Sequence, residues 1–144
     1  MTPQLSLRAV MDTNVLYAAF RSRLGASFEV FQRLRHGGWR AVVSNHLIHE
    51  YEEVLKRNAD ELGLSLADVD ELLNAICARA EEWPLQPGWQ PVLADADDEP
   101  LEQLAYESRA GRIVSHNVRH LRPAAALAVD VLKPREFLAM LRPS

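Results

Sequence analysis

Short apolar runs alternate with helix-like segments along this chain of 144 residues. The strand-like runs are Leu7–Leu16, "WRAVVS" from Trp39, "RIVSHN" from Arg112 and "VDVLKP" from Val129. The helix-like segments, which show the 3.6-residue apolar period or a capping residue, are Gly25–Arg35, Ser44–Leu62, Ser65–Ile76, Glu99–Ala110 and the segment from Pro134. This order predicts an α/β fold with a mostly parallel central sheet, right-handed crossovers and helices on both faces.

The length and composition fit a single domain that covers residues 1–144. Hydrophobic residues make up 48% and charged residues 25% of the chain, as in an ordinary globular protein. There is no secretory signal pattern, and no window approaches the roughly 18 apolar residues of a membrane helix. We therefore expect a cytoplasmic protein without membrane contact. Cys77, the only cysteine, lies in a helix-like stretch and is expected to be a small core residue.

Polar residues follow two of the strand-like runs at the point where each ends. Asp12 interrupts the first run, which is typical of a buried strand ending in a polar turn at residues 12–14, and residues 115–117 follow a later strand. The carboxyl ends of parallel strands meet at one edge of a sheet, so we expect these residues to lie together. A buried carboxylate costs several kcal/mol unless a cation, hydrogen-bond donors or a proton accompany it. The sequence must supply one of these for Asp12.

Acidic residues in two other segments are candidates to join Asp12. In the helix-like segment from residue 44, Glu50 and Glu52 flank the apolar stripe and Glu53 points away from it. The helical period does not choose between Glu50 and Glu52. The loop "DADDEP" carries Asp98 at the start of a helix, where an acid also serves as a cap. Both a structural and a chemical explanation are therefore open for Asp98.

Carboxylates that converge in this way need a counter-ion. Two carboxylates about 4 Å apart repel by roughly 4 kcal/mol at an effective dielectric constant near 20. Oxygen ligands in an incomplete cage suit Mg²⁺ or Mn²⁺, which keep several waters and bridge to phosphate oxygens. If Asp12 meets one helical glutamate and one loop aspartate, the sequence predicts a divalent metal site that a phosphate-containing substrate completes.

Four motifs, in order, resemble those of the PIN-domain family, the metal-dependent ribonucleases that include VapC-type toxins. "MDTNVL" resembles the family's first strand and first acid, here Asp12, with Asn14 in a supporting position. "VVSNHLIHEYEEVL" resembles the second motif, whose acid precedes an aromatic residue, and this selects Glu50. "DADDEPLEQLAYESRAGRIVSHN" resembles the third and fourth motifs and assigns Asp98 and Asn117. Many members carry a fourth aspartate where this chain has Asn117, so we expect one firm metal site rather than two.

The resemblance implies a three-layer α/β/α PIN-like fold and hydrolysis of RNA phosphodiester bonds with Mg²⁺ or Mn²⁺. Asp12, Asp98 and Glu50 are the implied metal ligands, Asn117 completes the catalytic set, and Ser115 supports the site by hydrogen bonding. The ion would polarise the phosphate and activate a water for in-line attack. The resemblance also implies the toxin role in a toxin–antitoxin pair, with a cognate antitoxin covering the acidic cleft. Homodimers are common in the family.

The charges are unevenly distributed along the chain. A net charge of −4 argues against non-specific adhesion to nucleic acid through the whole surface. Residues 18–45 contain five arginines and one acid, whereas residues 50–82 contain ten acids and three bases. In a PIN-like ribonuclease, Arg21 and Arg23 would contact RNA phosphates beside the acidic centre. The alternative is a pair of solvated helix faces of opposite sign.

Two other functions are weighed against this one. Aspartyl-phosphate phosphatases also place an acid after the first strand, but Asn14 stands where they have a second acid. Neither Lys56 nor Lys133 is well placed to be the lysine that such sites use. The other alternative is a PIN-like module that binds RNA or a protein partner without cleavage. Asn117 favours this alternative because an amide adds no charge to a metal site.

Overall fold

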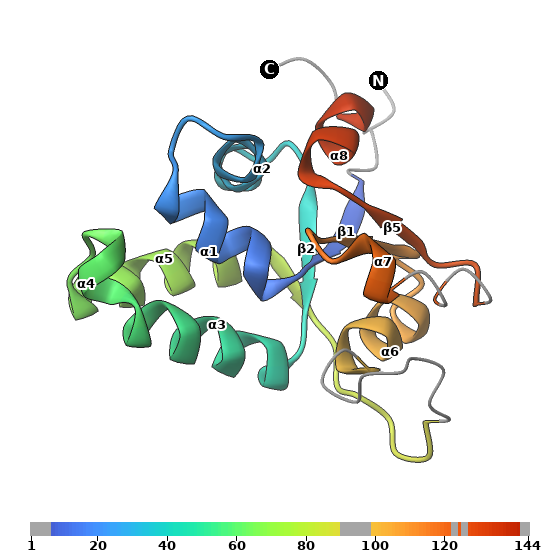
Figure 1. Ribbon diagram of the computed structural model, residues 1–144. Coiled ribbons are helices and arrows are strands. Elements are labelled where there is room, and N and C mark those ends of the chain that lie inside the picture. Colours follow the sequence, from blue (N-terminus) through green and yellow to red (C-terminus); the bar gives the residue numbers. More distant parts are fainter. Residues whose placement is uncertain (1–6, 90–98, 122–123, 125–126, 142–144) are drawn as a thin grey trace, which may run out of the picture.

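A parallel sheet forms the centre of the molecule (Figure 1). The computed structural model describes residues 7–89, 99–121, 124 and 127–141. Within these residues five strands pair in the order β3-β2-β1-β4-β5, and every pairing is parallel. The strands are β1 (Arg8–Met11), β2 (Arg40–Val43), β3 (Ala80–Glu82), β4 (Arg112–Val114) and β5 (Asp130–Leu132). The predicted α/β class with a central parallel sheet is confirmed.

Helices cover both faces of this sheet and make it the middle of three layers, as predicted. They are α1 (Thr13–Arg21), α2 (Ala26–Arg35), α3 (Asn45–Arg57), α4 (Ala59–Leu62), α5 (Leu66–Ala78), α6 (Glu99–Glu107), α7 (Val118–Leu121) and α8 (Pro134–Met140). In Figure 1 the helices from α1 to α5 lie on one side of the sheet, whereas α6 lies on the other. No helix in the described ranges is long and apolar enough to cross a membrane.

The central strand β1 is buried on both faces, which explains its continuous apolar sequence. Ala9, Val10 and Met11 have no exposed surface, and the strand pairs with β2 on one side and β4 on the other. The core around it includes Trp39, whose Nε1 donates a hydrogen bond to the backbone oxygen of Val30 at 2.9 Å. The strand that precedes Asp12 is therefore enclosed on both faces.

Helix α1 corrects the prediction of a polar turn after the first strand. The chain enters a helix at Thr13, directly after Asp12, and continues to Arg21. Sequence reasoning treated the apolar residues up to Leu16 as part of a strand. The buried side chains of α1 instead follow a helical spacing: Thr13, Val15, Leu16, Ala19 and Phe20.

Two further differences concern the segment between residues 44 and 83. The predicted helix Ser44–Leu62 is divided at Asn58, whose side-chain amide donates to the Val54 backbone oxygen at 2.8 Å. Strand β3 was not predicted, because its three residues carry two acids instead of an apolar run. As an edge strand, β3 places Glu81 beside Arg8, and a two-point hydrogen bond of 2.7 and 2.9 Å joins the two side chains.

Cys77 is exposed, so its prediction as a core residue is wrong. The buried stripe of α5 consists of Val69, Leu73 and Ile76, and Cys77 follows that stripe on the solvent side. A capping box begins this helix: Ser65 accepts a hydrogen bond from the Asp68 backbone amide, and the Asp68 carboxylate accepts one from the Ser65 backbone amide.

Candidate active site

Asp12 lies at the carboxyl end of β1 and faces the end of β4. Its backbone amide donates to the Val114 oxygen at 2.9 Å, which continues the sheet pairing by one residue. The Ser115 hydroxyl donates to Asp12 Oδ2 at 2.7 Å. Only 6% of Asp12 and none of Ser115 is exposed. The predicted meeting of these two residues at one edge of the sheet is observed, and the hydroxyl supplies one of the donors that a buried carboxylate requires.

Glu50 approaches the same edge from helix α3. Ser44 caps this helix by accepting a hydrogen bond from the Leu47 amide at 3.1 Å, and this cap fixes where the helical turns begin. The Thr13 hydroxyl then donates to Glu50 Oε1 at 2.6 Å. Glu50 is therefore hydrogen-bonded to the residue that directly follows Asp12.

The other two glutamates of α3 lie elsewhere. Glu52 is 3.2 Å from the Lys56 ammonium, and Glu53 is 3.4 Å from the Arg57 guanidinium, one turn further along the same helix. Glu53 is exposed, as the apolar period predicted. Of the three glutamates, Glu50 is the one whose carboxylate is hydrogen-bonded to the segment that carries Asp12, a distinction that the helical period alone did not make.

Tyr51 connects the two acids to the core. Its side chain is fully buried, and its hydroxyl donates to the Met11 backbone oxygen. Burial raises the pKa of Tyr51 well above its usual value, and the nearby carboxylates of Asp12 and Glu50 raise it further. The two carboxylates therefore act on one buried hydroxyl. Sequence reasoning placed Tyr51 on the apolar stripe of the helix and used it as the aromatic neighbour of Glu50, but missed its hydrogen bond to the strand that precedes Asp12.

The loop after β4 is held by hydrogen bonds to Asn14 of α1 and within the loop itself. Asn14 donates to the Ser115 hydroxyl at 3.4 Å and accepts from the His116 amide at 3.2 Å. The backbone amide of Asn117 donates to the Ser115 hydroxyl at 2.9 Å. Asn14 and Ser115 thus lie where a supporting role was predicted. The Asn117 backbone oxygen accepts from the Leu121 amide at 3.2 Å, while the residue itself is exposed at the start of α7.

His116 is joined to helix α2 by its ring. Its Nε2 atom is 2.8 Å from the Ser27 hydroxyl. Partial burial lowers the pKa of the imidazole below its usual value, which favours the neutral ring at neutral pH. Sequence reasoning did not connect these two residues, because 89 positions separate them and Ser27 belongs to none of the motifs.

Asp98, the third predicted metal ligand, lies outside the described residues, directly before α6. Among the residues that the structure describes, no group of three histidine, cysteine, aspartate or glutamate side chains is arranged to hold a metal ion. Two of the three predicted acids, Asp12 and Glu50, lie at the same edge of the sheet. Their oxygen-only chemistry suits Mg²⁺ or Mn²⁺.

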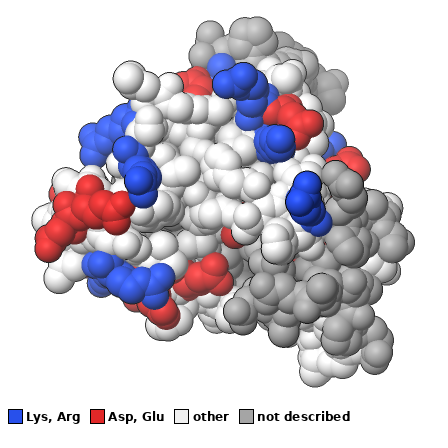
Figure 2. Space-filling view, viewed as in Figure 1, with Lys and Arg blue, Asp and Glu red and all other residues white. Residues whose placement is uncertain are grey.

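Arg21 and Arg23 lie at the far end of α1 from Asp12. A helix of nine residues spans about 13 Å at 1.5 Å per residue, so a considerable distance separates its two ends. Arg21 is 3.1 Å from the Glu61 carboxylate, and the Arg23 guanidinium lies 5.8 Å from the centre of the Phe20 ring. Figure 2 shows basic side chains distributed around a largely uncharged middle of this face rather than gathered in one patch.

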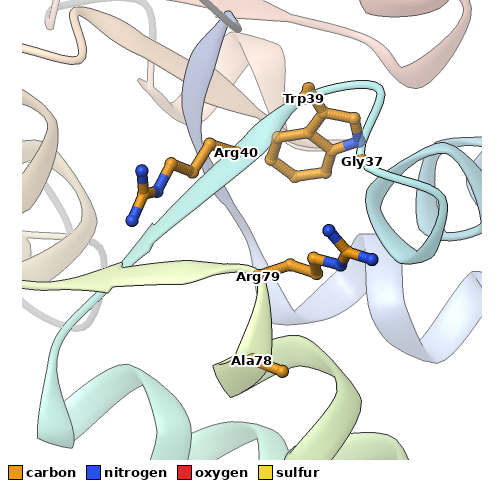
Figure 3. Close-up of a pocket in the computed structure, with 5 residues that line it drawn as sticks. All are labelled: Gly37, Trp39, Arg40, Ala78 and Arg79. Atoms are coloured by element: carbon orange, nitrogen blue, oxygen red, sulfur yellow. The ribbon is translucent and has the colours of Figure 1, made fainter.

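Two pockets lie away from the acids. One, of about 290 Å³, is lined by Gly37, Trp39, Arg40, Ala78 and Arg79, near the amino end of β2 (Figure 3). Its two guanidinium groups point in different directions, so they do not converge on one ligand (Figure 3). The other pocket, of about 480 Å³, has an aromatic wall of Phe20, Phe28 and Phe31. Neither pocket includes Asp12 or Glu50.

The sequence was compared with models of known protein families. A family model described as "PIN domain" matches residues 8–119, which is more than half of the chain and includes Asp12, Glu50 and Asn117. The chain belongs to the PIN-domain family. Comparison with curated proteins gave no match, and comparison with solved structures gave none either. PIN domains are in general nucleases that act on RNA and use divalent metals, and the three-layer fold of this PIN domain agrees with that class.

Proposed function

We propose that this PIN domain is a Mg²⁺- or Mn²⁺-dependent endoribonuclease that hydrolyses RNA phosphodiester bonds. The observation that carries the proposal is that two acids, Asp12 and Glu50, lie at the carboxyl edge of the sheet. Asp12 is held by the Ser115 hydroxyl, and Glu50 is held by the hydroxyl of the residue next to Asp12. Asp98 is the proposed third ligand.

The residues present fit a divalent ion of this kind. A buried aspartate directly after β1 and a half-buried glutamate in α3 offer hard oxygen ligands. When bound, the ion supplies Lewis-acid polarisation of the phosphate and lowers the pKa of a bound water. Ser115 and Thr13 orient the two carboxylates, and the backbone N–H of the exposed Asn117 donates to the same Ser115 hydroxyl. We assign the Asn117 side-chain amide an assisting role. Asn117 contributes no negative charge, which supports one firmly held ion.

The proposal is tested with a mixed RNA pool incubated with Mg²⁺ or Mn²⁺ and, separately, with a chelator. Asp12→Asn and Glu50→Gln should each reduce cleavage roughly 100-fold or more, because each removes several kcal/mol of interaction with the ion. Glu52→Gln is the matched control: it makes the same charge change on the same helix, but its carboxylate pairs with Lys56. Cleavage that persists in chelator or in Asp12→Asn would contradict the proposal.

A non-cleaving module that binds RNA or a protein partner is the second candidate. The exposed, uncharged Asn117 favours it, since it stands where many relatives have a fourth acid. The same RNA pool separates the two functions. Binding without cleavage by the unmodified protein, with either metal present, would establish the module instead of the nuclease.

We further propose a toxin role with a cognate antitoxin that covers the acidic edge and offers a cation to its carboxylates. The motif resemblance supports this role. Expression of the protein alone should arrest growth, and Asp12→Asn should relieve the arrest. A small gene directly upstream should encode the antitoxin. Harmless overexpression of an active enzyme would contradict the toxin role.

We also propose a homodimer. A molar mass of one chain, measured by light scattering, would exclude it.

A further inference from the structure

A chain of hydrogen bonds leads from Asp12 to helix α2. Asp12 accepts from Ser115, Ser115 accepts from Asn14, and Asn14 accepts from the His116 amide. The His116 ring then reaches the Ser27 hydroxyl at 2.8 Å. These contacts join residues from three separate segments of the sequence. The loop that carries the donor to Asp12 is thus tied to a helix that itself carries none of the proposed catalytic residues.

Helix α2 is a firm attachment point for this loop. It packs against α1 and α8, and its buried residues include Ser27, Val30, Phe31 and Leu34. Ser27 is only 5% exposed and lies in the first turn of the helix. A hydroxyl in such a position has few conformations available. The bond from His116 therefore fixes the loop relative to the helical layer as well as to the sheet.

We propose that His116 is a positioning residue for the active site and that it acts through Ser27. The proposal rests on the proposed nuclease function. His116 contacts two different helices. Its ring is hydrogen-bonded to Ser27 of α2, and its backbone amide donates to Asn14 of α1. This double contact holds the loop so that the Ser115 hydroxyl points at Asp12. Outer partners that orient metal ligands in this way typically contribute 10- to 100-fold to metal affinity or activity.

The same contact argues against a direct chemical role for the ring. Nε2 is already within hydrogen-bonding distance of Ser27, and the Ser27 hydroxyl is buried. A group that donates a proton to a leaving oxygen must instead reach the substrate. The two roles make different demands on Ser27. If His116 is a positioning residue, replacing Ser27 should reduce activity as much as replacing His116. If the ring acts directly on the substrate, replacing Ser27 should leave activity unchanged.

The test uses four variants of the full chain: His116→Ala, Ser27→Ala, the double variant, and His116→Gln, whose amide nitrogen reaches a position close to that of Nε2. Exposed His36, at the end of α2, provides the control His36→Ala. The measurements are kcat and KM for RNA cleavage, the Kd for Mn²⁺ by electron paramagnetic resonance, and thermal unfolding.

We expect His116→Ala and Ser27→Ala each to lower kcat or weaken Mn²⁺ binding by 10- to 100-fold, with little change in KM. The double variant should be no worse than either single variant, because both changes remove one shared bond. His116→Gln should recover most of the loss, His36→Ala should show none, and all variants should unfold cooperatively.

Three results would overturn the proposal. These are a His116→Ala variant within twofold of the unmodified protein in both kcat and Mn²⁺ affinity, an active Ser27→Ala beside an inactive His116→Ala, and losses that multiply in the double variant. If the unmodified protein binds Mn²⁺ but does not cleave RNA, the nuclease proposal fails and the Mn²⁺ affinities of the variants still decide the positioning role. If it neither binds Mn²⁺ nor cleaves RNA, both proposals fail.

Discussion

The hydroxyl of Tyr51 offers a direct test of how the core supports the site. The change is Tyr51→Phe, which keeps the buried ring and removes the donor to the Met11 backbone oxygen. That oxygen lies on the central strand, where no part of the residue is exposed. Leaving a buried acceptor without this donor costs about 1–3 kcal/mol. For a chain of this length, each kcal/mol lowers Tm by roughly 2–4 °C.

The pKa of Tyr51 adds a pH dependence with a definite sign. The folded pKa is raised, first by burial and then by the carboxylates of Asp12 and Glu50. The stabilisation is therefore complete below the unfolded pKa of about 10 and is lost as the pH rises toward the folded pKa. Above pH 10 the unmodified protein should lose up to about 1.4 kcal/mol per pH unit relative to Tyr51→Phe. The difference in stability between the two proteins should close with rising pH.

Urea denaturation at a series of pH values from roughly 7 to 11 measures this difference. Tyr106→Phe is the control, because Tyr106 is 49% exposed and its replacement should change stability by less than about 0.5 kcal/mol. Equal stability of Tyr51→Phe and the unmodified protein at pH 8, or a difference that stays constant up to pH 11, would refute the reasoning.

Three further predictions concern single side chains. Thr13→Val removes the donor to Glu50 and should lower kcat for RNA cleavage about 10- to 100-fold, whereas Thr13→Ser should retain most of the rate. Hydrogen bonds from Arg8 hold the pKa of Glu81 low, so the stabilisation by ionised Glu81 is present above the unfolded pKa of about 4.3 and is lost as the pH falls. The urea midpoint of Glu81→Gln should therefore depend less on pH in the acid range than that of the unmodified protein. Equal pH dependence of the two midpoints would contradict this. Trp39→Phe should cost about 1–3 kcal/mol because the Val30 oxygen loses its buried donor, and an unchanged denaturation midpoint would show that this bond contributes nothing.

Much of the fold could be predicted because its elements have clear periods. The apolar run of β1 and the helical stripes of α3 and α5 each bury one continuous surface, and this requirement is visible in the sequence. Helix α1 was missed because Val15 and Leu16 continue the apolar run of the strand, and only the spacing to Ala19 and Phe20 shows the helix. Strand β3 was missed because its pairing with β2 and the bond from Arg8 to Glu81 depend on tertiary contacts.

Some contacts of the candidate site could likewise be predicted from the sequence, and others could not. That Asp12 and Ser115 meet could be predicted from parallel topology, since both follow neighbouring strands. The period of α3 excluded Glu53 but not Glu52, because both flanks of a stripe look alike until a partner is known. The Thr13 contact that distinguishes Glu50 depends on how α1 leaves the sheet. The link between Ser27 and His116 joins positions 89 apart, and no local sequence pattern connects them.

The bond from the Asp12 amide to Val114 has a consequence for how such a protein could be controlled. Amides that are hydrogen-bonded at the end of a buried central strand typically exchange with solvent at a free energy close to that of global unfolding, so we expect the Asp12 backbone to have no low-energy local opening. Thermal inactivation and global melting should therefore coincide. Control of the proposed nuclease while the protein stays folded would then act by blocking access to Asp12 from outside.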